Sequence, residues 1–397
     1  MRISERARRA EPFYVMEVAK AALALGRSLQ DSDKPMVYLN IGEPDFSAPE
    51  RVREAAQRAI RDGATQYTPA TGMPALRERI SDWYRQRFGL AIDAQRIVVT
   101  AGASAALHLA CLALIDAGDE MLMPDPSYPC NRQFVSAADG RAVLIPTTAA
   151  ERFQLSADKV EQAWCAPGAK TRGVLLASPS NPTGTSIARE ELRRIHDFVQ
   201  TRGGVTLVDE IYLGLGYEEA YGQSALALDD AVISINSFSK YFSMTGWRLG
   251  WLVVPAQLVP VVERLAQHLF ICPSTVAQHA ALACFEPDSL AEYERRRSAF
   301  KARRDYLVPA LDALGLRVPV MPDGAFYAWA DCSLACERLG LAGSWELAFA
   351  LLQRAHVAVT PGRDFGNAQS AQFIRLSSAS SMDQLHSAVA RLGALLA

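Results

Sequence analysis

A single lysine is the first candidate for a chemical role in this sequence. Lys240 lies in Ser237-Phe-Ser-Lys-Tyr-Phe-Ser243, directly after the apolar run 232–235. The chain has 41 Lys and Arg residues, but only six of them are lysines. A lysine removed from water and placed near other cations has a lowered pKa and can form a Schiff base. Arg248 would supply such a cation and could also bind a phosphate, whereas the alternative for Lys240 is a purely structural role.

Asp209 is a second candidate, because it follows the apolar run 205–208 and its carboxylate would lie at the edge of a buried strand. A buried carboxylate requires a cation or several hydrogen-bond donors. It could pair with the protonated nitrogen of a pyridine ring, or it could cap a helix that follows the strand. Tyr212, three residues later, would share its face if one helical turn follows.

Two further places in the sequence suggest that anions bind. Gly102, Ala103 and Ser104 open a predicted helix, where free N–H groups and the helix dipole favour a phosphate. The alternative is an ordinary glycine turn with a serine helix cap. Arg375 lies in the alternating segment Phe373-Ile-Arg-Leu-Ser377, and an inward-facing arginine requires an anion. That anion would be a substrate carboxylate or the partner of a structural salt bridge.

These candidate residues fall just beyond the ends of predicted strands. The short apolar runs cover residues 97–100, 121–123, 142–145, 174–177, 205–208, 232–235 and 252–254. Apolar strands that alternate with helical patterns predict an α/β domain with a mainly parallel, roughly seven-stranded sheet covered by helices on both faces. Such sheets bind ligands outside the carboxyl ends of their strands, so five segments are expected to converge on one rim. The segments are residues 100–104, 125–128, 178–184, 209–212 and 236–240.

The remainder of the chain predicts a smaller α/β unit. A long charged helix is expected over residues 289–314, and an alternating segment, two strands and a final helix follow at 325–330, 357–360, 373–376 and the C-terminus. We therefore expect three parts. They are an N-terminal segment (residues 1–44) that packs with the small unit, a large domain (residues 45–288) and a small C-terminal domain (residues 289–397).

The composition excludes several classes of function. Half of the 397 residues are apolar and the formal net charge is −2, so there is no basic excess for binding nucleic acid. The seven cysteines are scattered without a C-x-x-C pair and no H-E-x-x-H motif occurs, so no metal site is predicted. No apolar run has the length of a membrane span or of a signal-peptide core. These features predict a cytoplasmic protein without a membrane partner.

Taken together, six segments resemble the fold-type I, pyridoxal-phosphate-dependent class I/II aminotransferases. The segments are Asn40-Ile-Gly-Glu-Pro-Asp-Phe46, Gln66-Tyr-Thr-Pro-Ala-Thr-Gly72, Pro179-Ser-Asn-Pro-Thr-Gly184, Val208-Asp-Glu-Ile-Tyr212, Ser237-Phe-Ser-Lys-Tyr-Phe-Ser-Met-Thr-Gly-Trp-Arg248 and Phe373-Ile-Arg-Leu-Ser-Ser378. They cover nearly the whole chain, and their shared order and spacing are highly specific. The resemblance implies a homodimer with shared active sites that moves an amino group from an L-amino acid to a 2-oxo acid by a ping-pong mechanism.

The resemblance also implies a role for each matching residue that faces the cofactor ring. Lys240 would form the Schiff base with pyridoxal phosphate and move the substrate proton. Asp209 would keep the pyridine nitrogen protonated, so that the ring accepts electrons. Asn181 and Tyr212 would contact the ring's 3-oxygen, and Tyr128 would stack on the ring.

A phosphate site and a carboxylate receptor follow from the same resemblance. The phosphate cup would consist of Gly102, Ala103, Ser104, Ser237, Ser239 and Arg248. Tyr67 would reach that phosphate from the neighbouring subunit. Arg375 would bind the substrate α-carboxylate, helped by Gly42 and Asn181.

Two departures from the family pattern bear on the substrate. Ser104 stands where some relatives carry a lysine, and Leu112 stands where some dicarboxylate-specific relatives place one. We therefore expect aspartate and glutamate not to be the preferred amino donors.

Other functions fit parts of the same pattern. A carbon–sulfur β-lyase or a decarboxylase could use the same Lys240, Asp209 and Arg375. A transcriptional regulator with an aminotransferase-like domain would carry a DNA-binding domain in front, and here the resemblance begins about forty residues from Met1. A nicotinamide-dependent dehydrogenase would need a G-x-G-x-x-G motif after a predicted strand, and the sequence has none there.

Overall fold

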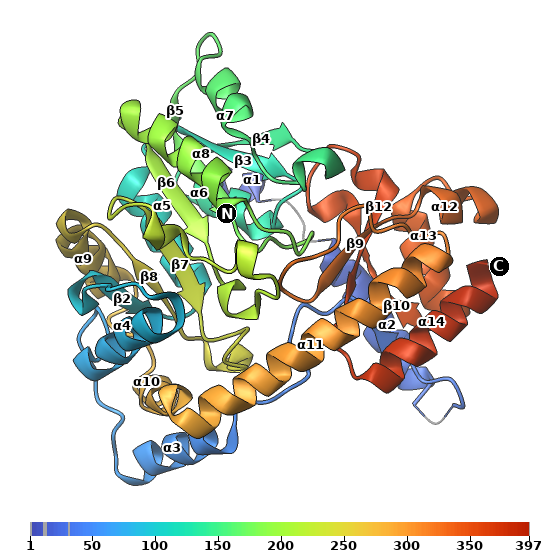
Figure 1. Cartoon of the computed structure of the whole chain (residues 1–397), viewed down its shortest axis with the longest axis horizontal. Helices are drawn as coiled ribbons and strands as arrows, with labels where there is room; N and C mark the ends of the chain where they lie inside the picture. Colours follow the sequence, from blue (N-terminus) through green and yellow to red (C-terminus); the bar gives the residue numbers. More distant parts are fainter. Residues whose placement is uncertain (1, 11–13, 31, 397) are drawn as a thin grey trace.

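A seven-stranded sheet forms the centre of the computed structural model, which describes residues 2–10, 14–30 and 32–396. The strand order is β2-β8-β7-β6-β5-β3-β4; β8 runs antiparallel to both its neighbours, and the other pairs are parallel (Figure 1). The strands are β2 (Ile97–Thr100), β3 (Glu120–Asp125), β4 (Arg141–Pro146), β5 (Thr171–Ala177), β6 (Val205–Asp209), β7 (Ile233–Ser237) and β8 (Gly250–Val253). Each predicted apolar run forms one of them, so the predicted mainly parallel sheet is confirmed.

Successive residues of a strand point to opposite faces of the sheet, and here they supply two separate hydrophobic cores. In β2, Ile97 and Val99 belong to one core and Val98 belongs to the other. The first core is covered by α3 (Glu50–Arg61), α4 (Pro74–Phe88), α7 (Ala157–Trp164), α8 (Arg189–Thr201) and α10 (Thr275–Leu282). The second is covered by α5 (Ala103–Leu114), α6 (Pro129–Ala137) and α9 (Val259–Leu269). Helices thus cover both faces, as predicted.

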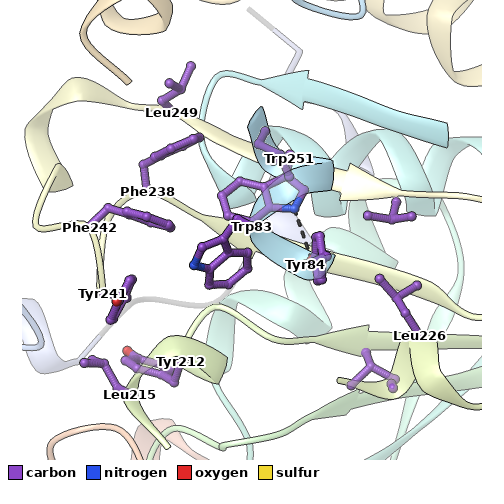
Figure 2. Close-up of a cluster of buried hydrophobic side chains, with 14 of the residues drawn as sticks. Trp83, Tyr84, Tyr212, Leu215, Leu226, Phe238, Tyr241, Phe242, Leu249 and Trp251 are labelled. Carbon is purple, nitrogen blue, oxygen red and sulfur yellow. Dashed lines mark hydrogen bonds between the residues drawn. The ribbon is translucent and has the colours of Figure 1, made fainter. Parts of the chain in front are cut away.

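An aromatic cluster packs behind the turn that follows β7 (Figure 2). Phe238 and Phe242 both contact Trp251 of β8. The ring centroid of Phe238 lies 4.9 Å from that of Trp251, and the ring centroid of Phe242 lies 6.2 Å from it. The indole Nε1 of Trp251 donates a hydrogen bond of 3.2 Å to the hydroxyl of Tyr84 on α4. Large buried rings contribute much of the packing energy of a core. Because they anchor the turn on both sides of Lys240, the backbone that carries this lysine is fixed.

The C-terminal part of the chain contains a three-stranded antiparallel sheet in the order β11-β12-β9. The elements of this part are β9 (Tyr327–Asp331), α12 (Ser333–Leu339), α13 (Ser344–Ala350), β10 (Val357–Ala358), β11 (Thr360–Pro361), β12 (Phe373–Ser377) and α14 (Met382–Leu396). The single strand predicted over residues 357–360 is wrong. It divides at Val359, because β10 pairs with β1 (Val37–Tyr38) and β11 pairs with β12.

Helix α11 (Pro287–Ala313) runs between the two sheet regions and matches the helix predicted over residues 289–314 (Figure 1). The N-terminal segment contacts both regions. Helix α2 (Val15–Ser28) packs on β10 and β11, whereas Arg6 and Arg9 of α1 (Glu5–Arg9) form ion pairs with Asp139, which follows α6. The predicted boundaries at residues 1 and 397 lie outside the described residues. In the described ranges, no helix combines the length and the apolar character that crossing a membrane requires.

Candidate active site

A cavity of about 370 Å³ lies at the carboxyl ends of the parallel strands. All five predicted segments contribute to its lining, and together we call them the strand-end rim (residues 100–104, 125–128, 178–184, 209–212 and 236–240). The lining is completed by residues of α2, residues 40–42, Ala177, Arg248, Tyr327 and Arg375, and parts of α5 and α6. Every predicted site residue lines the cavity except Gly102, which lies beside it, and Tyr67.

Lys240 extends from the turn after β7 and its ammonium donates a hydrogen bond of 2.6 Å to the Gly42 carbonyl oxygen. Burial, together with the positive charges of Arg375 and Arg248, lowers the pKa of Lys240 to about 8. A lysine with this pKa exists in both protonation states near neutral pH. It can therefore act as a nucleophile and can also accept and return a proton.

Asp209 ends β6 and is buried, with 4% of its surface exposed. Its Oδ1 accepts the Ile211 N–H at 3.2 Å, and the side chain of Asn131 on α6 adds a second hydrogen bond. Burial raises the pKa of Asp209 to about 6. Because its hydrogen-bond partners are uncharged groups, the carboxylate is suited to receive a cationic N–H from a ligand in the cavity.

The third charged group, Arg248, faces the start of α5. The backbone φ of Gly102 is +86°, a conformation that favours glycine, and a Cβ at that position would lie 2.7 Å from Nη2 of Arg248. The first N–H groups of a helix have no partners within the helix and attract anions. Ser237 and Ser239 line the same cavity, and the Ser237 hydroxyl accepts the Ser239 N–H at 3.0 Å. These groups form a cradle with the chemistry that a phosphate requires.

Arg375 of β12 is buried beside the cavity and is held by neutral acceptors. Its Nη1 donates to Asn181 Oδ1 at 2.9 Å, and its Nη2 donates to the Asn40 carbonyl oxygen at 2.8 Å and to the Thr360 hydroxyl at 3.3 Å. Its Nε is buried without a hydrogen-bond partner among the described residues. A planar guanidinium with an unused donor is suited to bind a carboxylate. Because Arg375 occupies Oδ1 of Asn181, that amide is left to donate to a ligand through its NH₂ group.

The sequence matches the family model described as aminotransferase class I and II over residues 34–392. The chain belongs to this family. The valine–pyruvate aminotransferase of Mycobacterium tuberculosis is 38% identical over 388 residues, which cover 97% of this chain and 96% of that relative. A crystal structure of an aminotransferase from Mycobacterium tuberculosis is 37% identical with a TM-score of 0.93, covering 100% of this chain and 99% of that chain. Thermus thermophilus aspartate aminotransferase with maleate is 33% identical with a TM-score of 0.90, and both chains are covered completely.

The predicted family, the fold-type I architecture and the aminotransferase class of the enzyme are thereby confirmed. The family uses pyridoxal phosphate and acts on amino acids and 2-oxo acids. The names of the relatives differ in the amino acid they mention, so they do not specify the donor of this aminotransferase.

Sequence reasoning missed two residues of the aminotransferase that support the predicted ones. The Tyr327 hydroxyl lies 2.7 Å from the Tyr212 hydroxyl, and the Arg375 guanidinium lies over the Tyr327 ring at 4.5 Å. Asn131 supports Asp209. Tyr327 lies on β9, which pairs with β12, the strand that carries Arg375. The alternating pattern of residues 325–330 already predicted this strand, and it could have pointed to Tyr327. The sequence around Asn131 contains no comparable signal.

The cavity of the aminotransferase also has an apolar part. Its members, here called the apolar wall, are Val15, Met16, Ala19, Ile41, Leu107 and Phe134. Leu112, which the sequence suggested as a determinant of the substrate, packs with the core around α5 and does not line the cavity. Ser104 does line the cavity. Of the two departures from the family pattern, only Ser104 therefore still supports the expectation that acidic donors are disfavoured.

Proposed function

We propose that this aminotransferase binds pyridoxal 5′-phosphate through Lys240 and transfers an amino group between an L-amino acid and a 2-oxo acid in two half-reactions. The observation that carries the proposal is the set of four charged side chains lining one cavity, which are Asp209, Lys240, Arg248 and Arg375. Each matches one chemical group of the cofactor or the substrate. In the same order, these groups are the pyridine nitrogen, the aldehyde carbon and the phosphate of the cofactor and the α-carboxylate of the substrate.

The residues present fit the cofactor. Asp209 is a buried carboxylate whose hydrogen-bond partners are neutral, so a protonated pyridine nitrogen would relieve the cost of its burial. The cradle of Gly102, Ser237 and Arg248 would hold the phosphate, together with Ala103, Ser104 and Ser239. Tyr128 lines the cavity and would contact the ring face, while Asn181 and Tyr212 would donate to the 3-oxygen. When bound, pyridoxal phosphate supplies an electron-accepting ring that stabilises negative charge at the substrate Cα.

The protein's own part in catalysis is to bind, orient and move a proton. Arg375 would bind the α-carboxylate with its free Nε edge, while Asn181 keeps the guanidinium in place. Lys240 would hold the cofactor. It would then take the proton from the substrate Cα and deliver it to the C4′ carbon of the cofactor. Its pKa of about 8 suits both transfers near neutral pH.

The test is the visible absorption spectrum of the purified protein with pyridoxal phosphate, recorded before and after addition of single amino acids. We expect a visible band that an amino acid abolishes and a 2-oxo acid restores. Release of pyruvate and ammonia, or of carbon dioxide, without restoration by a 2-oxo acid would instead indicate a β-lyase or a decarboxylase. A protein that gains no visible band with the cofactor would refute the assignment of Lys240.

We also propose a homodimer in which Tyr67 of one subunit reaches the phosphate of the other. This tyrosine is 84% exposed in the single chain, although large aromatic side chains usually lie in contact with other groups. Sedimentation analysis would give the oligomeric state, and Tyr67→Phe would weaken cofactor binding in a dimer of this kind. A monomer with full activity would refute it.

We further propose a cytoplasmic location and a division of the chain at residues 44 and 288. A separate hydrophobic core that joins the N-terminal segment to the C-terminal part supports the division, although Tyr293, Phe300 and Phe326 pack in the core of the seven-stranded sheet. Limited proteolysis that cleaves elsewhere first would contradict it.

A further inference from the structure

The apolar wall is the part of the cavity that the proposed chemistry leaves unassigned. The charged residues among the described cavity lining are Asp209, Lys240, Arg248 and Arg375. The proposed function assigns all four to the cofactor or to the α-carboxylate. Within the described lining, no cation is therefore left for a second carboxylate on the substrate. A carboxylate placed against the wall would give up part of its hydration without gaining a cation from this subunit.

Two members of the apolar wall expose a large part of their apolar surface. Met16 is 49% exposed and Ile41 is 44% exposed, although both line the cavity. Removing apolar surface from water is favourable in proportion to the area covered. An apolar substrate side chain that lies on these residues would cover this surface and would itself be desolvated.

The part of the wall that lies on α2 is fixed in place, which a specificity determinant requires. The Asp364 carboxylate accepts the backbone N–H of Tyr14 at 2.9 Å and that of Val15 at 2.5 Å. Both N–H groups belong to the start of α2, where negative charge is favourable. The guanidinium of Arg363 lies over the Tyr14 ring at 3.9 Å. The first turn of α2 therefore presents Val15 and Met16 to the cavity in one arrangement.

We infer that the amino donor of this aminotransferase is an amino acid with an apolar side chain, which lies against the apolar wall while Arg375 binds its carboxylate. The inference rests on the proposed function, because Arg375 and Lys240 define which end of the cavity receives the side chain. It goes further than the expectation that acidic donors are disfavoured, since it names the surface that selects the donor.

The experiment compares two unreactive carboxylates that bind the protein loaded with pyridoxal phosphate, with dissociation constants measured by calorimetry. We expect 4-methylpentanoate, which has an apolar end, to bind about tenfold more tightly than glutarate, which has a second carboxylate. Equal or tighter binding of glutarate would overturn the inference and leave the proposed function intact. Failure to take up the cofactor would instead refute the proposed function.

Two variants of α2 provide a matched pair for the same measurement. Met16→Arg places a cation in the apolar wall, and we expect it to bind glutarate more tightly than 4-methylpentanoate. Leu23→Arg adds the same charge to the same helix at a position that is 55% exposed and outside the cavity lining, and it should keep the parent preference. An unchanged preference in Met16→Arg, or the same reversal in Leu23→Arg, would overturn the inference.

Discussion

The strand-end rim and the apolar wall line the same cavity, but the chain holds their side chains in different ways. Rim residues such as Asp209 and Ser237 end strands of the seven-stranded sheet and are almost completely buried. The wall residues Met16 and Ile41 are half-exposed, and they lie in the N-terminal part of the chain, which packs largely on the C-terminal elements. The rim carries charged groups whose pKa values are shifted by burial, whereas the wall carries none.

This difference separates the chemistry of the site from the choice of substrate. Groups that must hold a charge in a fixed place are carried by a rigid sheet, which keeps them desolvated and aligned. Groups that only contact a substrate side chain lie outside the sheet, on helices α2, α5 and α6 and on the loop that carries Ile41. We therefore expect changes in the rim to abolish turnover and changes in the wall to alter selectivity. The predictions below test this contrast.

The largest expected effect is that of Lys240→Ala. Removing the amine removes both the covalent anchor of the cofactor and the group that moves the substrate proton, so turnover and the visible absorption band should both be lost. The measurement is kcat together with the spectrum of the protein incubated with pyridoxal phosphate. Lys301→Ala, which removes an exposed lysine paired with Asp305, is the control and should behave as the parent. Transamination at a substantial rate in Lys240→Ala would contradict the assignment.

Arg375→Ala should lower kcat/KM by about 10²- to 10³-fold, because it removes the partner of a desolvated substrate carboxylate. Arg375→Lys should recover little of this loss, since an ammonium lacks the planar fork. The uptake of pyridoxal phosphate, measured by its visible band, should remain in both variants. If the rise in KM is no larger than tenfold for every amino acid tested, then the carboxylate is bound elsewhere.

Asp209 should make the stability of the cofactor-free protein depend on pH. Burial raises its pKa from the ordinary 3.8 to about 6, so the folded state holds more protons than the unfolded state between these values. The free energy of unfolding should therefore fall as the pH rises from about 4 to about 6, by about 3 kcal/mol at most. Asp209→Asn should remove the part of this fall that Asp209 contributes and should be more stable than the parent at pH 7. The neighbouring Glu210, whose pKa is raised by burial to about 7, should keep contributing its own part.

The measurement for this prediction is urea unfolding of the cofactor-free protein at several pH values. Asp288→Asn, which alters an aspartate with a 78% exposed side chain, is the control and should retain the fall. Equal pH slopes in the parent and Asp209→Asn would show that the buried carboxylate does not destabilise the cofactor-free protein.

Tyr327→Phe should have the smallest effect of the four. Only one proton can lie between the Tyr212 and Tyr327 hydroxyls, and donation by Tyr327 frees the Tyr212 proton to point into the cavity. Without the Tyr327 hydroxyl, kcat should fall by about fivefold or less. The pH at which the visible band of the bound cofactor titrates should rise. Tyr217→Phe removes a hydroxyl bonded to the Ala325 carbonyl outside the cavity and should leave that pH unchanged. An unaltered pH titration in Tyr327→Phe would show that the two hydroxyls are not coupled.

The rim was predictable from the sequence, and the wall was not, for a physical reason. A rim residue such as Lys240 follows an apolar strand, so the local pattern already places it at the carboxyl edge of the sheet. Met16 reaches the cavity because α2 is held by Asp364, about 350 positions along the chain from Tyr14. The partner of Tyr212 lies 115 positions away, and the strand predicted over residues 357–360 divides because its halves join different sheets. Contacts of this kind depend on tertiary packing, which local periodicity does not encode.

The neutral surroundings of Arg375 have a consequence for the enzyme in a mixture of metabolites. Because Asn181, Asn40 and Thr360 hold the guanidinium, an incoming acid does not have to break an ion pair before it binds. With Arg375 as the receptor, every α-amino acid and 2-oxo acid of suitable size competes for the same cation. The apolar wall distinguishes their side chains only after the carboxylate has bound. The flux through this aminotransferase would then depend on the composition of the whole amino-acid pool, with abundant poor donors acting as competitive inhibitors of the preferred one.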